Sequence, residues 1–266
     1  PDESVTELQI IDILATVKYL IYLNNNEKLP NGETPEVDDI DHLGGRHIRP
    51  VGEQIEEQFL RAMDVIVRSF KEQIQQIVAS HTKSISAILP RNLINNIPLT
   101  TAINRFFKTN ELSQLLDETN LLSAVTGKRR LSALGVGGLS RRYAGFEVRD
   151  IHPTSYGRIC PIETPEGQNI GLITSLALFA RVNKYGLIET PYRKVENRKV
   201  TDEVVYMDAS EEEKYVIASA DAIDVSTGKI KEGKVLARVR GEITYVDSKE
   251  VEFVDVSPQQ QLSVSA

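Results

Sequence analysis

Hydrophobic residues recur at helical spacing over the first hundred residues of the chain. An apolar stripe from Val5 to Ile21 predicts a helix over residues 4–23, and a second from Ile55 to Ile77 predicts one over residues 53–79. A shorter helix is predicted over residues 100–107. This part of the chain is therefore expected to be mainly helical.

The pattern changes after residue 109. Up to residue 191 glycine and proline are frequent, and only residues 172–182 suggest a helix or a buried apolar run. Loops this irregular usually bind something. From residue 200 onward, alternation punctuated by glycine predicts short strands at residues 204–207, 214–218, 235–239, 242–246 and 251–256. We expect an α+β fold with a helical part over 1–100, an irregular mixed region over 101–196 and a small antiparallel β-module over 197–266.

Composition narrows the class of protein. Hydrophobic residues make up 41% and charged residues 26%, which is ordinary for a globular chain. The single cysteine, Cys160, excludes a disulfide framework and fits a reducing compartment. No apolar run is long enough to predict a membrane span. Because the chain opens at Pro1 without an initiator methionine, we expect it to be cut from a longer protein.

Charge is distributed unevenly along the chain, whose net charge is −7. Residues 128–158 contain seven Lys and Arg against two acids, whereas residues 201–255 contain 14 acids against seven bases. A basic, arginine-rich segment around Gly135, Gly137 and Gly138 suits a local polyanion contact, with bare backbone amides near a phosphate. The alternative is a solvated charged face.

No self-sufficient active site or metal site is predicted. The four histidines lack zinc-binding spacing, and the cluster of Asp38, Asp39, Asp41 and His42 favours a salt-bridging turn over a metal. Cys160 is expected to be a buried thiol and not a nucleophile paired with His152. Glu163 and Glu166 are expected to bind neighbouring backbone or arginine.

Long ordered motifs in the middle of the chain resemble the fork region of the bacterial-type RNA polymerase β subunit. They include Lys128-Arg129-Arg130-Leu131-Ser132-Ala133-Leu134-Gly135, Ala144-Gly145-Phe146-Glu147-Val148-Arg149-Asp150, Cys160 to Gly167 and Asn169-Ile170-Gly171-Leu172-Ile173. Weaker similarity reaches both ends. The resemblance implies an internal fragment containing the end of the protrusion (1–100), the fork (101–196) and the start of the external region (197–266).

The family's enzyme joins ribonucleotides on a DNA template, with magnesium held by the partner β′ subunit. The resemblance therefore implies no catalytic residue, metal or cofactor on this chain, which alone is expected to be inactive. The implied partners are the β′, α, omega and sigma subunits, template DNA and nascent RNA, with no membrane, in the bacterial cytoplasm and nucleoid or the plastid stroma. The implied channel residues are Gln114, Arg130, Arg141, Glu166 and Asn169. Asp117 is expected to pair with Arg130, and Glu166 to hold loop geometry.

The same region of the family binds rifamycin antibiotics. The positions that match this pocket are Ser113, Gln114, Asp117, Arg130, Ser132, Leu134, Pro165, Asn169 and Ile173. Departures from the family pattern are Gly127 for histidine, Leu115 for phenylalanine, Thr119 for asparagine, and Val136 and Gln168 for proline. In the fork loop, Arg142-Tyr143 replaces an acid–arginine pair.

Two other classes of function stay open. The chain is alternatively a stand-alone module that binds single-stranded nucleic acid through its basic segment. Few aromatic residues (Tyr143, Phe146 and Tyr156) are available there for stacking on bases. A third alternative is an interaction domain whose acidic β-module docks a partner.

Overall fold

The computed structural model describes residues 7–32, 34–79, 93–224 and 226–266. The chain divides into two compact units, residues 1–40 and 41–266. Each unit is described by itself.

The first unit contains helix α1 (Ile10–Asn25). Its N-terminus is closed by reciprocal hydrogen bonds between Gln9 and Asp12, and its C-terminus by Asn26 in a left-handed conformation. The Tyr19 hydroxyl also donates to the Glu36 carbonyl at 2.9 Å. The predicted helix over residues 4–23 is confirmed in position, although it begins at Ile10 and residues 4–6 lie outside the described residues.

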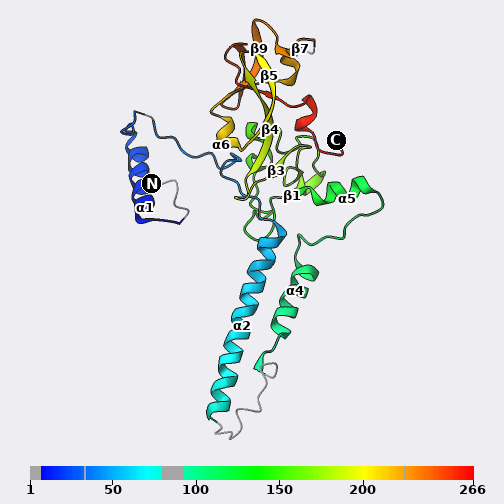
Figure 1. Cartoon of the computed structure of the whole chain (residues 1–266). Coiled ribbons are helices and arrows are strands. Elements are labelled where there is room, and N and C mark those ends of the chain that lie inside the picture. The colour runs from blue at the N-terminus through cyan, green and yellow to red at the C-terminus, as the bar shows by residue number, and fades with distance from the viewer. Residues whose placement is uncertain (1–6, 33, 80–92, 225) are drawn as a thin grey trace. The chain divides into compact units, whose positions relative to one another are not determined.

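The second unit begins with two helices that pack side by side, α2 (Val51–Ala79) and α4 (Ile97–Thr109) (Figure 1). Both match predicted helices and are amphipathic, with Ala62 and Ile66 buried on α2. Two short helices, α5 (Leu121–Lys128) and α6 (Ala209–Glu212), were not predicted. Asn120 caps α5 by accepting from the amides of Leu122 and Ser123.

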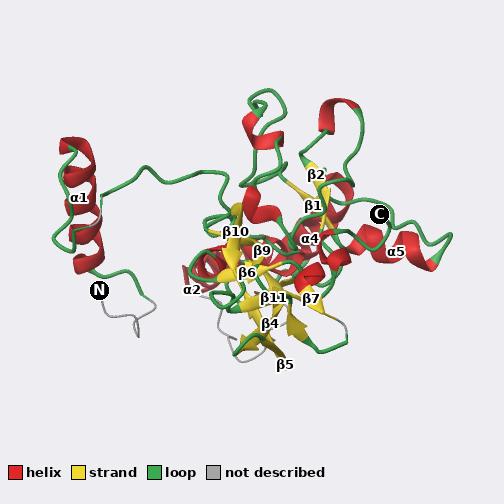
Figure 2. Ribbon diagram, turned by 90° about the horizontal axis from the view of Figure 1, so that it is seen from above, coloured by secondary structure: helices red, strands yellow, loops and turns green. Residues whose placement is uncertain are grey.

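Strands form two sheets within the described residues. β1 (Arg130–Ser132) pairs antiparallel with β2 (Ile173–Ser175). The larger sheet has the order β10-β9-β6-β11-β4-β5-β8-β7, with β3 beside β4. Most of its strands are labelled in Figure 2. Its strands are β3 (Arg181–Val182), β4 (Ile188–Glu196), β5 (Lys199–Met207), β6 (Val216–Ala218), β7 (Ile223–Asp224), β8 (Lys229–Ile230), β9 (Lys234–Val239), β10 (Glu242–Asp247) and β11 (Phe253–Asp255). All pairs are antiparallel except β6 with β11. The α+β class is confirmed.

The predicted strands of the β-module are confirmed, but the sheet extends further back along the chain. β4 supplies a central strand and pairs with β5 across the expected boundary at residue 196. The domain boundaries therefore stay a prediction. Residues 172–182 are not a helix: they form β2, a turn and β3, and bury Leu172, Ala177 and Ala180. The apolar run is buried because it packs under Ile188 of β4.

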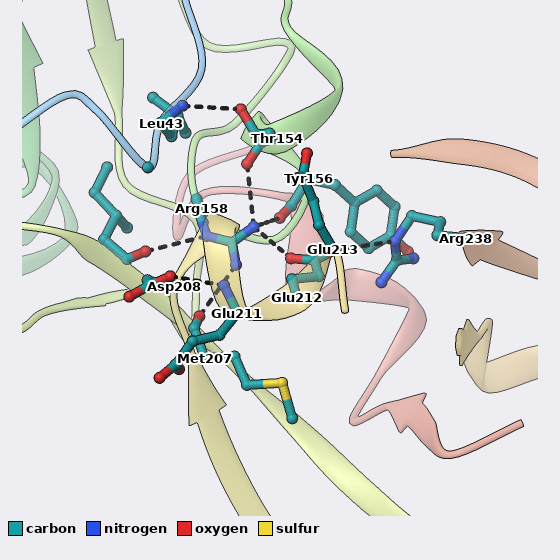
Figure 3. A network of polar contacts seen from close by, with 12 residues as sticks. Leu43, Thr154, Tyr156, Arg158, Met207, Asp208, Glu211, Glu212, Glu213 and Arg238 are labelled. Carbon is teal, nitrogen blue, oxygen red and sulfur yellow. Dashed lines mark hydrogen bonds and ion pairs between the residues drawn. The ribbon is translucent and has the colours of Figure 1, made fainter. Parts of the chain in front are cut away.

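Arg158 connects the irregular region to the large sheet. Its side chain is fully buried, and Nε and Nη2 donate to the carbonyls of Ile188 in β4 and Met207 in β5, both at 3.0 Å (Figure 3). Nη1 donates to the Thr154 carbonyl at 3.1 Å and lies 2.5 Å from Glu212 of α6. The guanidinium thus satisfies carbonyls from three segments and a carboxylate.

A second buried arginine continues the network. Arg238 of β9 lies 3.4 Å from Glu212 and pairs through both terminal nitrogens with Asp255 of β11, at 2.7 and 3.1 Å. The Tyr156 hydroxyl donates to the same carboxylate at 2.8 Å, and its ring lies 3.6 Å from the Arg238 guanidinium. Two cations and two anions therefore balance in the interior, which limits the cost of burying each.

Replacing Arg158 by leucine should destabilise the chain strongly. Arg158→Leu leaves the buried carboxylate of Glu212 and three carbonyls short of a donor, so the free energy of unfolding should fall by about 3–5 kcal/mol. Urea unfolding of the chain measures this. Arg61→Leu, on the surface of α2 with a 3.7 Å pair to Glu57, should cost about 0.5 kcal/mol or less. Equal losses in the two variants would contradict a structural role for the network.

Candidate nucleic-acid interface

Strand β1 begins the basic segment and brings several predicted residues together. Arg130 lies opposite Ser175 and Ser132 opposite Ile173 in the β1–β2 pair. Arg130 and Ser132 are exposed, whereas Ile173 is half-buried. The Ser132 hydroxyl accepts the Leu134 amide at 3.1 Å and so starts the following loop.

The glycine-rich loop is closed by hydrogen bonds from two of its backbone amides. The amides of Gly138 and Leu139 donate to the carbonyls of Gly135 and Ala133, at 3.0 and 2.7 Å. A Cβ at Gly138 would lie 2.4 Å from the Ala133 carbonyl oxygen, so only glycine allows this closure. The prediction that bare amides here approach a phosphate is therefore wrong for Gly138, whose amide is used within the loop, and it stays a prediction for residues 135–137.

Arg49 holds the outer side of the same loop. Its Nη1 donates to the Val136 carbonyl at 3.1 Å, and it pairs with Glu53 and Glu57 of α2. These hydrogen bonds and carboxylates raise the pKa of the guanidinium. The glycines accordingly serve close packing of the loop against α2.

Three of the seven basic residues in the segment have structural roles. Arg129 donates to the carbonyls of residues 177, 178 and 180, and Arg149 to those of Gln168 and Ile170 at 2.7 and 2.9 Å. Arg158 is fully buried. The exposed basic residues that remain are Lys128, Arg130, Arg141 and Arg142. The basic surface is thus smaller than the sequence count suggests.

Arg141 and Asn169 are brought into direct contact from separate loops. Nε of Arg141 donates to Oδ1 of Asn169 at 3.0 Å. The loop of Arg141 lines an open cleft of about 1220 Å³, together with Arg142, Phe146 and Arg149. Because only Nε of this exposed guanidinium forms a hydrogen bond within the described residues, its two terminal nitrogens are available to a ligand.

The expected pairing of Asp117 with Arg130 is not present. The Asp117 carboxylate instead accepts from the hydroxyl and amide of Thr119, at 2.7 and 3.0 Å, and these hydrogen bonds lower the pKa of its carboxyl. Within the described part of the chain, no carboxylate lies within ion-pair distance of Arg130. A local Asx-type turn satisfies Asp117 at less entropic cost than a pairing across the fold.

The charge of Arg130 acts electrostatically on the carboxylate of Glu163. Burial acts to raise the pKa of its carboxyl, but hydroxyl groups of Ser263, Ser265 and Ser175 and the charge of Arg130 together lower it below the usual value. Residue spacing does not indicate this contact, because residues near 263 are remote from 163 along the chain. Glu163 is expected from the sequence to bind neighbouring backbone or arginine. The charge of Arg130 does act on it, but the groups that lower its pKa by hydrogen bonding are serine hydroxyls from other segments.

Glu166 has no hydrogen bond or ion pair from its carboxylate within the described residues. It is exposed and precedes the 3₁₀ turn Gly167–Asn169. Loop geometry is instead held by Thr164, whose hydroxyl donates to the Ile173 carbonyl at 3.0 Å and accepts the Gly171 amide at 2.8 Å. The role expected for Glu166 therefore belongs to Thr164.

The remaining predicted positions differ in exposure. Gln114 and Pro165 are exposed, Leu134 is buried, and the Ser113 hydroxyl donates to the Phe106 carbonyl at 3.4 Å. A second cleft of about 850 Å³ is lined by Arg130, Ser132 and Leu134, among others. Leu134 borders both clefts.

Cys160 and His152 do not form a nucleophile and base. Cys160 is buried, as predicted, and Nδ1 of His152 binds the Thr154 hydroxyl at 2.6 Å. The cluster near Asp41 is a salt-bridging turn, as predicted, with Asp41 2.6 Å from Arg46. In the ranges that the structure describes, no group of three or more His, Cys, Asp or Glu residues is placed to hold a metal, and no helix is long and apolar enough to cross a membrane.

Comparison with known proteins identifies two family domains in the chain. Residues 114–182 match RNA polymerase Rpb2, domain 3, and residues 192–257 match the RNA polymerase beta subunit external 1 domain. The chain is 53% identical over 255 residues to the DNA-directed RNA polymerase subunit beta of Anaeromyxobacter sp. (strain K). It is 50% identical over 256 residues to that of Desulfotalea psychrophila. Each match covers 96% of this chain but only 17% and 18% of the relative.

Two glycines of the loop that Arg149 binds, Gly167 and Gly171, provide a matched test of the packing. Gly171 and Gly167 have positive φ values of 72° and 86°, but a Cβ at Gly171 would lie 2.4 Å from the Arg149 carbonyl oxygen, whereas Gly167 has open space. Gly167→Ala should therefore lower the free energy of unfolding by about 1 kcal/mol from backbone strain alone. Gly171→Ala should cost about 3 kcal/mol or more in urea unfolding, because strain and a backbone clash add. Equal costs would show that the Arg149 contact is not rigid.

Proposed function

We propose that this chain, which belongs to the RNA polymerase β-subunit family, lines the catalytic cleft and the nascent-RNA path during DNA-templated RNA synthesis. The observation that carries the proposal is the exposed Arg141, held by Asn169 at the edge of an open cleft. The identity of 50–53% to β subunits over 96% of the chain supports the assignment of this cleft to a polymerase.

Asn169 and Gln114 are suited to a nucleic acid of any sequence. Oδ1 of Asn169 accepts from Arg141, which directs its amide NH₂ to donate to a sugar or phosphate oxygen. Gln114 is exposed and offers the same groups. Contacts of this kind position a strand without reading its bases.

In this proposal Arg141 and Arg130 supply the positive charge that binds the phosphates of the nucleic acid. Both are exposed, and neither forms an ion pair within the residues that the structure describes. An arginine without a carboxylate partner keeps its full charge for a phosphate, which it binds through two parallel hydrogen bonds. We assign Arg141 to a phosphate near the separation of the downstream DNA strands, and Arg130 to the RNA channel.

The chain acts as one part of a larger enzyme in this proposal. We infer assembly with β′, α and omega subunits and a sigma factor on template DNA, in the cytoplasm and nucleoid of a bacterium or in the plastid stroma. The described residues of this chain offer no carboxylate set for the catalytic magnesium. From the family resemblance we assign the catalytic magnesium to β′, and this chain alone should be inactive.

Removing Arg141 should change the salt dependence of the transcription complex. In a polymerase whose β subunit carries this sequence, Arg141→Ala should reduce the slope of log K against log salt by roughly one, because one phosphate contact is lost. Dissociation of elongation complexes at rising salt measures it. Lys229→Ala, which removes an exposed charge from β8, should leave the slope unchanged. An unchanged slope in Arg141→Ala would count against the proposed role.

The departures at the rifamycin-pocket-like positions predict weak rifamycin binding. Losing the histidine at Gly127 and the phenylalanine at Leu115 removes a hydrogen bond and packing area, together worth about 1–3 kcal/mol, or about 5- to 150-fold in affinity. A Cβ at Gly127 would lie 3.6 Å from Leu116 Cδ1, and Leu115 is fully exposed, so both sites accept larger side chains.

Restoring these two residues should therefore restore rifamycin binding. Inhibition of the polymerase by rifamycin should strengthen in Gly127→His and in Leu115→Phe, and most in the double variant. Phe107→Leu, a change of similar size on α4, serves as the control. Inhibition of the unmodified enzyme at the drug concentrations usual for the family would refute the prediction.

A further inference from the structure

An exposed aromatic side chain directly follows the two arginines of the Arg141 loop, and no contact within the described residues explains it. Tyr143 is 86% exposed. Within the described residues its hydroxyl makes no hydrogen bond, and its ring makes no aromatic or cation–π contact. Arg141 and Arg142, the two preceding residues, are also exposed.

The backbone presents this side chain on an anchored loop. The amides of Tyr143 and Ala144 both donate to the Ser140 carbonyl, at 2.9 and 3.1 Å, which forms a tight turn. Arg141 joins this turn to Asn169 on a second loop. The side chain is thus held out from a fixed base, and little backbone entropy remains to be lost on binding.

The chemistry of the turn fits one class of ligand. A tyrosine ring stacks on a base face, and neighbouring arginines bind the phosphates of the same strand. Base faces are accessible only where a strand is unpaired, because in a duplex both faces are covered by stacking. A turn bearing two arginines and a tyrosine therefore suits a single strand and not a duplex.

We propose that Tyr143 stacks on an unpaired base of a DNA strand at the downstream edge of the melted region. This inference rests on the proposed function, in which the Arg141 loop lies near the separation of the strands. It adds a base-stacking residue at a position where the family usually has an arginine. The ring acts without selecting a base, since every base offers a π face.

The test uses the assembled polymerase whose β subunit carries this sequence, bound to a DNA scaffold with 2-aminopurine at the downstream edge of the bubble. Stacking on the probe changes its fluorescence. Tyr143→Ala should abolish the change and weaken scaffold binding about 5-fold or more, as expected for one lost base stack. Tyr143→Phe should behave as the unmodified enzyme, because it keeps the ring.

Other outcomes overturn the proposal. A Tyr143→Phe variant that matches Tyr143→Ala assigns the effect to the hydroxyl, and a signal seen only with the probe in the RNA assigns it to the wrong strand. Unchanged fluorescence and binding in Tyr143→Ala, with the salt slope still reduced in Arg141→Ala, rejects the stacking alone. An unchanged slope in Arg141→Ala as well would reject the proposed function with it.

Discussion

The buried guanidinium of Arg158 is the interaction on which the rest of the second unit depends. Residues 154–158 have little regular structure of their own, so their position comes from side-chain contacts. Arg158 donates to carbonyls of β4 and β5 and pairs with Glu212 of α6, and Arg238 and Asp255 complete the charge balance. An unbalanced charge at this depth would cost several kcal/mol, so these segments form a single cooperative arrangement.

Arginine has two separate roles in this part of the chain, one structural and one at the surface. Arg129, Arg149 and Arg158 donate to backbone carbonyls and hold loops together, whereas Arg141 and Arg142 on a neighbouring loop face solvent. Carbonyl-binding arginines stiffen the loops that would otherwise be free to move. The exposed arginines are then presented from a rigid base, which reduces the entropy lost when a polyanion binds.

The glycines of the same region matter because they lack a Cβ and so leave room for close packing, more than because their amides are open to a ligand. Gly138 and Gly171 each allow a close backbone approach that a Cβ would prevent. The contact at Gly138 closes the loop after β1. The contact at Gly171 lets the backbone of Arg149 lie close to the loop that contains Ile170. Both loops border the cleft of the Arg141 loop, so tight packing shapes the surface that we propose contacts nucleic acid.

The residue pattern predicts the helices α2 and α4, most strands of the β-module and the family, because periodicity and long motifs are local properties. It also located the basic segment and the Arg142-Tyr143 departure. Only the tertiary structure decided which arginines are buried, that Asp117 binds Thr119 and not Arg130, and that Thr164 and not Glu166 holds its loop. These outcomes depend on which groups from distant segments meet and on whether water is excluded there. Neither property is encoded in the spacing of residues along the chain.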